Sequence, residues 1–580
     1  ITHPLQVALY LAELNLDNLS YGTRNISVIE TWLSEYQESN ALLTYSENVQ
    51  TLQSICNREG VELSVLGHIT GDGNLQIVCQ DGEYKVNLNY EKEYKEHPPR
   101  KYEMSSKPPV VRNPLPEHDK NNTTQLLSGE HDIAKIFNLI LENVDVGSKR
   151  FLTNKVDRSV SGLIAQQQCV GPLHTPLADY CLYTTSHFPD EMGRFSGCVS
   201  AIGERPYYQF SEGPDAMEMM VCKTLEEMLF NLVWVGIDNF NNIRLSANWM
   251  WPNPTKDPYQ ANLMYRSMDF LSKACCQIGI AIDGGKDSLS MVAKHDEKEI
   301  KAPGSLVLTG YAAVPNIYLK TTPDLKPAFK RSTIILIQNI TSPKAGTLAM
   351  IQNTKKIFES IQALIKGGMK ILAGHDCSDG GLLSCVLEMA FAGNTGVCIN
   401  IPHYIKEEEA NMFMIREMSG VVIQIRNEDL PQVYSFLTKL HKDNTRDCAI
   451  QVDPIAIPLW YDKVIIQKGI KVTKENVNDG PQKKVYYTQD MTYLRKKWES
   501  GSRKLELLQC NPKCVKQEYE LYEDFEVFND ITYRLPLENL LKSEEIKKKI
   551  KENSSRKIGI IRGEGSNSER ELAAAFKHAG

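Results

Sequence analysis

Apolar residues recur along the chain both at helical spacing and at the alternating spacing of strands. The clearest helix is predicted over residues 213–236, GPDAMEMMVCKTLEEMLFNLVWVG, because Pro214 stands near its start and Gly236 closes it. Another is expected within ILAGHDCSDGGLLSCVLEMAFAG (371–393), where an apolar strand leads through a polar turn into an apolar helix that ends at Gly393. Ser378 or Asp379 of that turn is the expected N-cap.

Two distant stretches share one order of predicted elements. Residues 35–78 and 416–467 each read as a strand, an amphipathic helix and two further strands, with a glutamate ahead of an apolar strand. Sequence identity between them is low, so a coincidence of pattern is the alternative to a true repeat. The favoured hypothesis is a duplicated module whose first copy is truncated on its N-terminal side.

Two polar segments separate these regions. Residues 91–130 combine charged and amide residues with little apolar periodicity, which is typical of a linker. The prolines of this segment are Pro98, Pro99, Pro108, Pro109, Pro114 and Pro116. Residues 495–555 carry charge runs of alternating sign, such as RKKWESGSRK, which favours solvated helices within connecting structure.

Composition narrows the class of protein. A length of 580 residues suggests roughly four domains, and 42% hydrophobic residues are enough for large cores. No apolar run is long enough for a membrane span and no cleavable leader opens the sequence, so a cytoplasmic protein is expected. A net charge of −7 argues against a nucleic-acid binder. Fourteen cysteines without a CxxC pair indicate reduced thiols and no zinc site. Because the sequence starts at Ile1 and stops inside a helical pattern, it is interpreted as a fragment of a longer protein.

Several oxygen-bearing side chains stand where chemistry competes with an ordinary structural role. Asp179 precedes an apolar, β-rich run, as a turn-capping aspartate also would. Glu227 and Asn231 stand four residues apart on one helix face, where a surface hydrogen-bonded pair is the ordinary interpretation. Asp376 belongs to a turn (375–381) whose two aspartates, serine and two glycines exceed what capping needs. Together, three carboxylates and an amide would suit magnesium shared with nucleotide phosphates.

The stretch DGGKDSLSM (283–291) joins an apolar run to a polar one. Its glycines would let backbone N–H groups approach a phosphate, while a lysine neutralises charge and an aspartate holds a cation. A strand-to-helix turn has the same composition, so the pattern alone leaves both interpretations open.

Six ordered segments carry a family resemblance. They are TNKVDRSVSGLIAQQQCVGPLHTPLADY, LSANWMW, DGGKDSLSM, APGSLVLTGYA, GHDCSDGGLLSCVLEMAFAGNTG and IGIIRGEGSNSERELAAAF. In this order they resemble the phosphoribosylformylglycinamidine synthases, the formylglycinamide ribonucleotide amidotransferases of purine synthesis. LSEYQESNALL near the start resembles the large animal-type form, and the likeness extends almost from end to end.

The resemblance implies an α+β fold of tandem aminoimidazole-ribonucleotide-synthetase-like modules, with mixed sheets and packed helices, followed by the first β-α unit of a class I glutaminase domain. It also implies a division of the chain into six parts. These are the C-terminal part of the first module (1–90), a Pro-rich linker (91–130), the N-terminal (131–320) and C-terminal (321–470) domains of the second module, a connecting segment (471–555) and the truncated start of the glutaminase (556–580).

The implied activity is that of an ATP-dependent C–N ligase, which converts formylglycinamide ribonucleotide and glutamine-derived ammonia to formylglycinamidine ribonucleotide. The implied cofactors are ATP or ADP and Mg²⁺, with no nucleic acid or membrane as partner, and the full-length form is expected to be a monomer. This chain would carry the auxiliary nucleotide–magnesium half-site. The matching metal ligands are Asp179, Glu227, Asn231 and Asp376, and the matching nucleotide contacts are Lys149, Ala178 and Ser378. Lys286 and Asp287 would lie near a phosphate, and His375 is interpreted as a structural or supporting residue.

Two family features have no counterpart here. No Gly-x-Cys-x-Gly turn is present for the glutaminase nucleophile, and the loop with the family's catalytic histidine is missing. Catalytic residues therefore stay unassigned, and this chain is expected to be inactive in synthesis. The alternatives are a non-catalytic nucleotide-bound scaffold and a related single-activity synthetase built on the same module. The duplicated module and the glutaminase-like tail argue against the latter.

Overall fold

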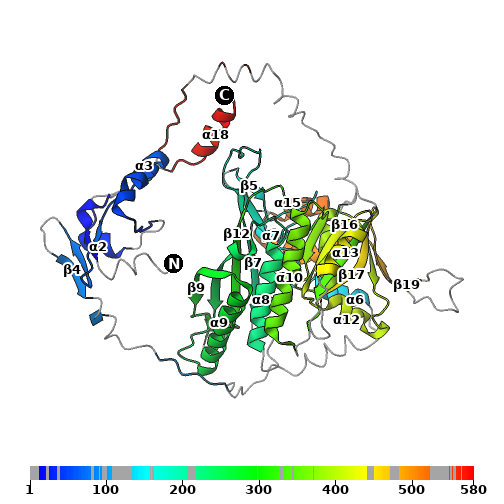
Figure 1. The fold of residues 1–580 in the computed structure, drawn as a ribbon. Helices are drawn as coiled ribbons and strands as arrows, with labels where there is room; N and C mark the ends of the chain where they lie inside the picture. Colours follow the sequence, from blue (N-terminus) through cyan, green and yellow to red (C-terminus); the bar gives the residue numbers. More distant parts are fainter. Residues whose placement is uncertain are drawn as a thin grey trace. The chain divides into compact units, whose positions relative to one another are not determined.

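The computed structural model describes the greater part of the chain, in two units that are treated separately, Ile1–Glu103 and Met104–Gly580 (Figure 1). The described residues are 12–20, 25–34, 39–79, 84–89, 92–93, 101–106, 133–153, 155–156, 158–159, 162–206, 216–296, 298–326, 331–341, 345–369, 371–440, 450–469, 483–522, 548, 552, 557–563 and 565–579. Most of the predicted linker and residues 523–547 of the predicted connecting segment lie outside them.

The first unit contains a small mixed sheet. Its strands, in spatial order, are β2 (Gly67–Ile69), β1 (Ala12–Asn15), β3 (Asn74–Val78) and β4 (Tyr84–Asn89). Its helices are η1 (Leu16–Asn18), α2 (Val28–Leu33), η2 (Ser46–Asn48) and α3 (Val49–Glu59). The strand expected at the start of segment 35–78 is absent from the described residues 39–45, which are all exposed. A stretch with nothing to bury gains little from strand formation, and β1 pairs with β3 instead.

The second unit is built on two larger sheets. The first has the order β5 (Ile164–Gln166), β6 (Cys181–Thr184), β7 (Gly197–Pro206), β12 (Ser305–Val314), β8 (Arg244–Met250) and β9 (Ala281–Ser288). The second has the order β14 (Ala373–Asp376), β16 (Gly420–Arg426), β13 (Ser332–Asn339), β17 (Ile450–Leu459), β15 (Gly396–Ile401), β18 (Val464–Gly469) and β19 (Lys483–Gln489). A separate hairpin joins β10 (Val292–His295) to β11 (Lys298–Lys301).

Burial patterns explain how the two sheets are covered. Along β12, fully buried residues alternate with more exposed ones, as expected for a sheet with one covered face. Along β13, seven of eight residues are buried, so both faces of the second sheet are covered. One continuous core runs from the first sheet through the helices α8 (Ala216–Leu232), α9 (Pro258–Ile278), α10 (Thr347–Lys366) and α13 (Leu430–Leu440) to the second sheet.

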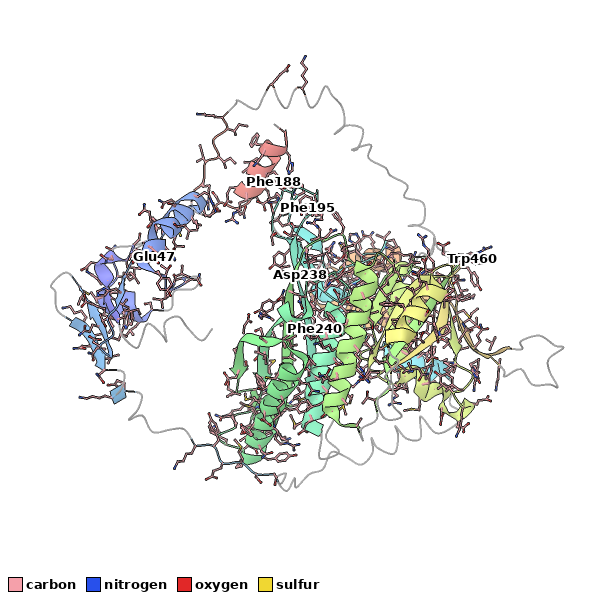
Figure 2. The ribbon with its side chains drawn as sticks, in the orientation of Figure 1. Glu47, Phe188, Phe195, Asp238, Phe240 and Trp460 are labelled. Carbon is pink, nitrogen blue, oxygen red and sulfur yellow. The ribbon has the colours of Figure 1, made fainter. Side chains whose placement is uncertain are left out.

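A second core lies on the other face of the second sheet. The helices that contribute to it are α6 (Ile133–Leu141), α11 (Gly381–Gly393), α12 (Ala410–Ile415) and α14 (Met491–Gln509). The remaining helices are α7 (Arg150–Thr153), η4 (Phe240–Asn242), η6 (Glu407–Glu409), α15 (Pro512–Tyr522) and α18 (Glu569–Ala579). The ring of Phe240, labelled in Figure 2, has its centroid 5.1 Å from that of Phe358, and this contact helps to hold η4 against α10.

The structure corrects three expectations. α11 begins after Gly380 in a left-handed conformation, without a side-chain cap, so the expected capping by Ser378 or Asp379 is wrong. The DGGKDSLSM stretch forms most of β9 and leads into the β10–β11 hairpin, so the strand-to-helix turn is wrong as well. Finally, α14 is not a solvated helix. It buries Trp498 together with the charged residues Arg495, Glu499 and Glu506, some of which have partners far away in the sequence.

The helix predicted over 213–236 is confirmed as α8, whose described bounds are Ala216–Leu232. Within the described part of the chain, no helix has both the length and the hydrophobicity needed to cross a bilayer.

Candidate functional site

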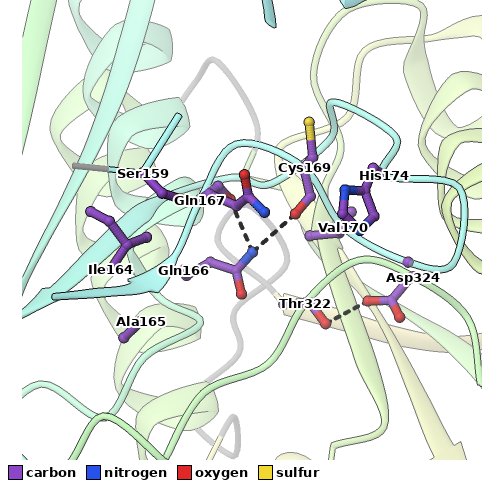
Figure 3. A pocket seen from close by; sticks show the side chains of 11 residues that line it. Ser159, Ile164, Ala165, Gln166, Gln167, Cys169, Val170, His174, Thr322 and Asp324 are labelled. Atoms are coloured by element: carbon purple, nitrogen blue, oxygen red, sulfur yellow. Dashed lines mark hydrogen bonds between the residues drawn. The ribbon is translucent and has the colours of Figure 1, made fainter. Parts of the chain in front are cut away.

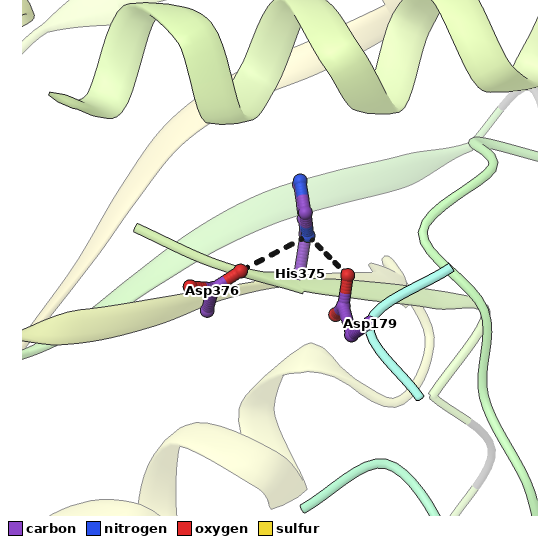
Figure 4. A group of neighbouring side chains, drawn as sticks. All are labelled: Asp179, His375 and Asp376. Atoms are coloured by element: carbon purple, nitrogen blue, oxygen red, sulfur yellow. Dashed lines mark ion pairs between the residues drawn. The ribbon is translucent and has the colours of Figure 1, made fainter. Parts of the chain in front are cut away.

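Three of the side chains singled out in the sequence meet in one buried cluster. The Nδ1 atom of His375 lies 2.7 Å from Oδ1 of Asp179 and 3.3 Å from Oδ1 of Asp376 (Figure 4). One possible ligand atom from each of the three residues lies within 4.8 Å of the others. The Asp179 side chain is only 2% exposed. The two aspartates, almost 200 residues apart in sequence, therefore share one enclosed position.

The fold explains this meeting. Asp376 is the last residue of β14, and Asp179 lies two residues before β6 in the other sheet. α8 lies between the two sheets in the shared core and contacts β7 and β14. At the C-terminal side of α8, the ring of Trp234 lies so close to Gly374 that a Cβ there would be 2.2 Å from it. Only glycine permits this approach of β14 toward α8.

Glu227 of α8 joins the same cluster electrostatically. Its Oε1 atom is 3.2 Å from Nη2 of Arg205, and its Oε2 atom accepts a 2.8 Å hydrogen bond from the Glu204 backbone N–H. Arg205 also forms an ion pair with Asp379, in the turn after Asp376. Burial raises the pKa of Glu227 to about 8, with the opposing effect of Arg205 and a further increase from Asp376. Glu227 and Asp376 are thus close enough for their charges to interact.

Asn231 lies one turn further along α8 and also faces β7. Its Nδ2 atom donates a 2.9 Å hydrogen bond to the carbonyl of Ile202. The expected surface pair between Glu227 and Asn231 is not formed, because each residue bonds to β7 instead. The amide oxygen of Asn231 has no hydrogen bond among the described residues, which leaves an oxygen ligand available.

Of the residues matched to nucleotide contacts, Ala178 and Ser378 adjoin the cluster in sequence, and Lys149 is close enough to Glu388 and Asp379 for their charges to act on it. The Lys149 amine donates to the carbonyls of Val144, at 2.7 Å, and Gly147, at 2.6 Å. Burial lowers the pKa of Lys149, while the charges of Glu388, Asp145 and Asp379 act to raise it. The N–H of Ala178 donates to the Gln168 carbonyl at 3.0 Å, directly before Asp179. Ser378, half-buried, follows Asp376 by two residues.

His375 has a more central place than the sequence indicated. Its Nε2 atom lies 3.3 Å from Oε2 of Glu388, so carboxylates stand at both ring nitrogens. Burial acts to lower the pKa of His375, but Asp179 and the hydrogen bonds to Asp179 and Glu388 outweigh it and raise the pKa well above its usual value. The contacts with these carboxylates favour the protonated form of the imidazole.

The donor set fits magnesium. The Oδ2 atom of Asp179 is buried and has no hydrogen-bond partner among the described residues, so one lone-pair site is unused. Burial raises the pKa of Asp179 to about 7, as expected for a carboxylate that lacks a full complement of partners. Asp179 and Asp376 offer the hard oxygen atoms that magnesium prefers, and Glu227 is close enough to Asp376 for their charges to interact. The charge of Lys149 interacts with Glu388 and Asp379 beside them, which suits a phosphate.

Lys286 and Asp287 lie elsewhere, on β9 at the edge of the first sheet. β12 and β8 separate β9 from β7, which places the Asp287 backbone roughly 14 Å from that of Arg205, at about 4.8 Å per strand. Successive residues of a strand point to opposite faces, so the two side chains cannot both face one phosphate. In the strand register, only Asp287 shares a face with Arg205.

A cavity of about 340 Å³ lies beside the segment that leads to Asp179 (Figure 3). Its walls include Gln166 and Gln167 near β5, His174 from the following turn, and Thr322 with Asp324 from the opposite loop. Asp179 and Asp376 are not among its lining residues. The carboxylate cluster is therefore a separate feature, enclosed by side chains.

Sequence reasoning missed two members of the site. Arg205 lies near the end of β7, next to Glu204 in the segment GERP. Two adjacent charged residues after a strand with alternating burial are a weak signal for a buried ion pair. Glu388 is the only charged residue in the apolar helix GLLSCVLEMAFAG, which is a usable signal, because a lone buried carboxylate needs a partner.

Comparison with known proteins finds two domain families. Residues 148–313 match the family model described as the FGAR-AT PurM N-like domain. Residues 9–80 and 330–444 both match the model of the C-terminal domain of AIR synthase related proteins. The described parts of these regions contain mixed sheets and helices, and in the second unit the helices pack on the sheets.

The chain also resembles curated and solved proteins. It is 33% identical to the phosphoribosylformylglycinamidine synthase of Dictyostelium discoideum, covering 98% of this chain and 42% of that protein. It is 34% identical to the Drosophila melanogaster protein of the same name, covering 96% and 41%. The solved phosphoribosylformylglycinamidine synthase II of Thermotoga maritima gives a TM-score of 0.44 at 11% identity, over 65% of this chain and 54% of that one. The chain spans about two-fifths of the length of these curated relatives.

Proposed function

This chain belongs to the phosphoribosylformylglycinamidine synthase family, and we propose that it forms part of an ATP-dependent, glutamine-using ligase. That ligase would convert formylglycinamide ribonucleotide to formylglycinamidine ribonucleotide. The part in hand would contribute an auxiliary site for a magnesium-bound adenine nucleotide. The identity near one third along almost the whole chain supports the family activity.

The observation that carries the auxiliary site is the meeting of Asp179 and Asp376 from two distant segments, with Glu227 close enough to Asp376 for their charges to interact. A fold gains no stability from gathering carboxylates in a buried place, because each loses hydration and repels the others. Such clusters are common where a cation or a phosphate ligand binds. The unused Oδ2 atom of Asp179 supports the same proposal.

The chain's own residues would divide the work. Asp179, Glu227 and Asp376 would hold magnesium through carboxylate oxygens, and Asn231 through its amide oxygen. Lys149, Ala178 and Ser378 would contact the nucleotide, with the Lys149 amine exchanging its carbonyl partners for a phosphate. Magnesium, when bound, supplies charge neutralisation for the phosphates. Lys286 and Asp287 would reach a phosphate only if the ligand extended across the first sheet.

The domain plan belongs to the same proposal. The family model that matches residues 9–80 and 330–444 supports tandem modules, divided as 1–90, 131–320 and 321–470. Segment 471–555 would connect them to a glutaminase domain that begins in 556–580. Formylglycinamide ribonucleotide, ATP and glutamine-derived ammonia would be the substrates of the whole protein, in the cytoplasm.

Direct binding tests the auxiliary site. The 580-residue chain should bind about one ADP per molecule in the presence of Mg²⁺, and EDTA should release it. Without the cation, the negatively charged carboxylates and phosphates repel each other. Equilibrium dialysis with labelled ADP measures the stoichiometry, and the unfolding midpoint should rise with ligand concentration. No glutamine- or ammonia-dependent synthesis is expected. ADP binding that ignores EDTA would contradict the proposed magnesium site.

A further inference from the structure

The loop that carries Lys149 is attached to helix α14 by hydrogen bonds. The N–H of Ser148 donates to the Trp498 carbonyl at 3.0 Å, and the Trp498 indole donates to the Val146 carbonyl at 2.8 Å. The N–H of Phe151 donates to Oγ of Ser502 at 2.7 Å. Three backbone groups on both sides of Lys149 are therefore held by consecutive turns of one helix.

A buried ion pair completes this attachment. Nε and Nη2 of Arg150 lie 3.0 Å and 2.8 Å from Oε1 of Glu499, and the two side chains are 1% and 4% exposed. The guanidinium carbon lies 3.9 Å from the centre of the Tyr522 ring. The remaining arm, Nη1, donates to the carbonyl of His174 at 3.2 Å. One side chain thus joins α14, α15 and the turn that leads to Asp179.

That turn needs external support. His174 has φ of 47°, a left-handed conformation that is uncommon for a residue with a Cβ. Gly171, three residues earlier, approaches the Ala392 carbonyl so closely that a Cβ would be 1.7 Å from its oxygen. A strained residue persists where its surroundings over-determine it. The bond from Arg150 to His174 supplies that restraint, five residues before Asp179.

Stability alone does not explain the Arg150–Glu499 pair. Apolar side chains of similar volume often stabilise a fold as well as a buried ion pair does, since burial of two charges is costly. A guanidinium differs from an apolar side chain because its donors point in fixed directions. Here they point to Glu499 and to His174 at once.

From this geometry we propose that Arg150, oriented by Glu499 of α14, is a positioning residue for the nucleotide–magnesium site. It fixes together the loop that carries Lys149 and the turn that delivers Ala178 and Asp179. The inference rests on the proposed function, because it assigns Arg150 and Glu499 to the support of that same site. The face of α14 that carries Trp498, Glu499 and Ser502, which the sequence alone indicates to be solvated, then fixes the position of the Lys149 loop. We call this set of contacts the clamp.

Two variants of the 580-residue chain separate positioning from stability. Glu499→Gln should lower the ligand-free unfolding midpoint and weaken Mg·ADP binding roughly 10- to 100-fold, as loss of a supporting partner does at metal sites. Arg150→Met with Glu499→Met should restore the midpoint, because no unpaired charge stays buried. Its affinity for Mg·ADP should nevertheless stay weak. Recovery of wild-type affinity together with the midpoint would overturn the inference.

The control removes a pair of opposite charges that does not join α14 to the loop that carries Lys149. Lys155→Met with Glu518→Met deletes the exposed ion pair between α15 and the chain after α7, and its Mg·ADP affinity should equal that of the wild type. Trp498→Phe serves if the double methionine variant fails to fold. It keeps a ring but loses the bond to Val146, so affinity should fall by about 2- to 10-fold, and unchanged affinity would contradict the clamp. Absence of Mg·ADP binding by the wild type would instead refute the proposed function, and with it the inference.

Discussion

Replacing Asp179 and Asp376 together by alanine should abolish magnesium-dependent ADP binding, with a loss of affinity of at least about 100-fold. Asp376 ends β14 and Asp179 lies two residues before β6, and their carboxylates supply two of the three ligand atoms that lie within 4.8 Å of one another. No neighbouring side chain replaces them, because Glu227 would already be one of the ligands and Glu388 lies at the opposite nitrogen of the His375 ring. Equilibrium dialysis of labelled ADP against the purified variant measures the loss.

The same variant should stay folded, which separates loss of binding from loss of structure. His375 keeps Glu388 as a partner, and removal of two buried carboxylates relieves their mutual repulsion. A control with the same change in net charge is Glu407→Ala with Glu518→Ala, which removes two exposed carboxylates paired with Lys484 and Lys155. The control should bind Mg·ADP like the wild type. Retention of ADP by the aspartate variant at the control's level would show that the metal ligands lie elsewhere.

The local sequence pattern predicts the helices and strands that carry this site better than it predicts which of their side chains lie close together. Proline and glycine at the two ends, with helical spacing between them, were enough to predict α8, and an apolar run after Asp179 was enough to predict the strand β6. Whether Asp179 lies near Asp376 depends on the packing of two sheets around shared helices. No spacing in the sequence contains that information, because Asp376 ends a strand of one sheet and Asp179 precedes a strand of the other.

The largest error of interpretation has a physical cause, which is pairing at long range. Arg495 and Glu499 look solvated, since charged residues usually are, yet both are buried through bonds to Asn394 and Arg150. His375, interpreted as a structural or supporting residue, also depends on long-range pairing. Its partners are Asp179, from the segment before β6, and Glu388, from the next helix. Charged residues within an apolar or aromatic context, such as Glu388 and Glu499, are the signal that sequence does offer.

The protonation of the site should make the metal-free chain less stable as pH rises from about 5 to 8. Burial raises the pKa of Asp179 to about 7 and that of Glu227 to about 8, from 3.8 and 4.5. Between the unfolded and the folded pKa of each carboxyl, the folded chain binds more protons than the unfolded chain. The free energy of unfolding therefore falls as pH increases. His375 acts in the same direction above its unfolded pKa, because its folded pKa is raised. Each proton of difference contributes about 1.4 kcal/mol per pH unit.

Magnesium should reverse this dependence, since it binds the ionised carboxylates and releases their protons. Urea unfolding at pH 5, 6, 7 and 8 in EDTA, repeated with Mg²⁺ and ADP, measures both slopes. Asp179→Asn with Glu227→Gln removes the two titrating groups at nearly constant volume, so the difference between wild type and variant isolates their contribution from that of other acids. In EDTA the wild type should lose stability relative to the variant as pH rises. Parallel pH profiles for the two chains would mean that these carboxyls are already ionised in the folded state. The raised pKa values of Asp179 and Glu227, and the magnesium-linked release of their protons, would then be refuted.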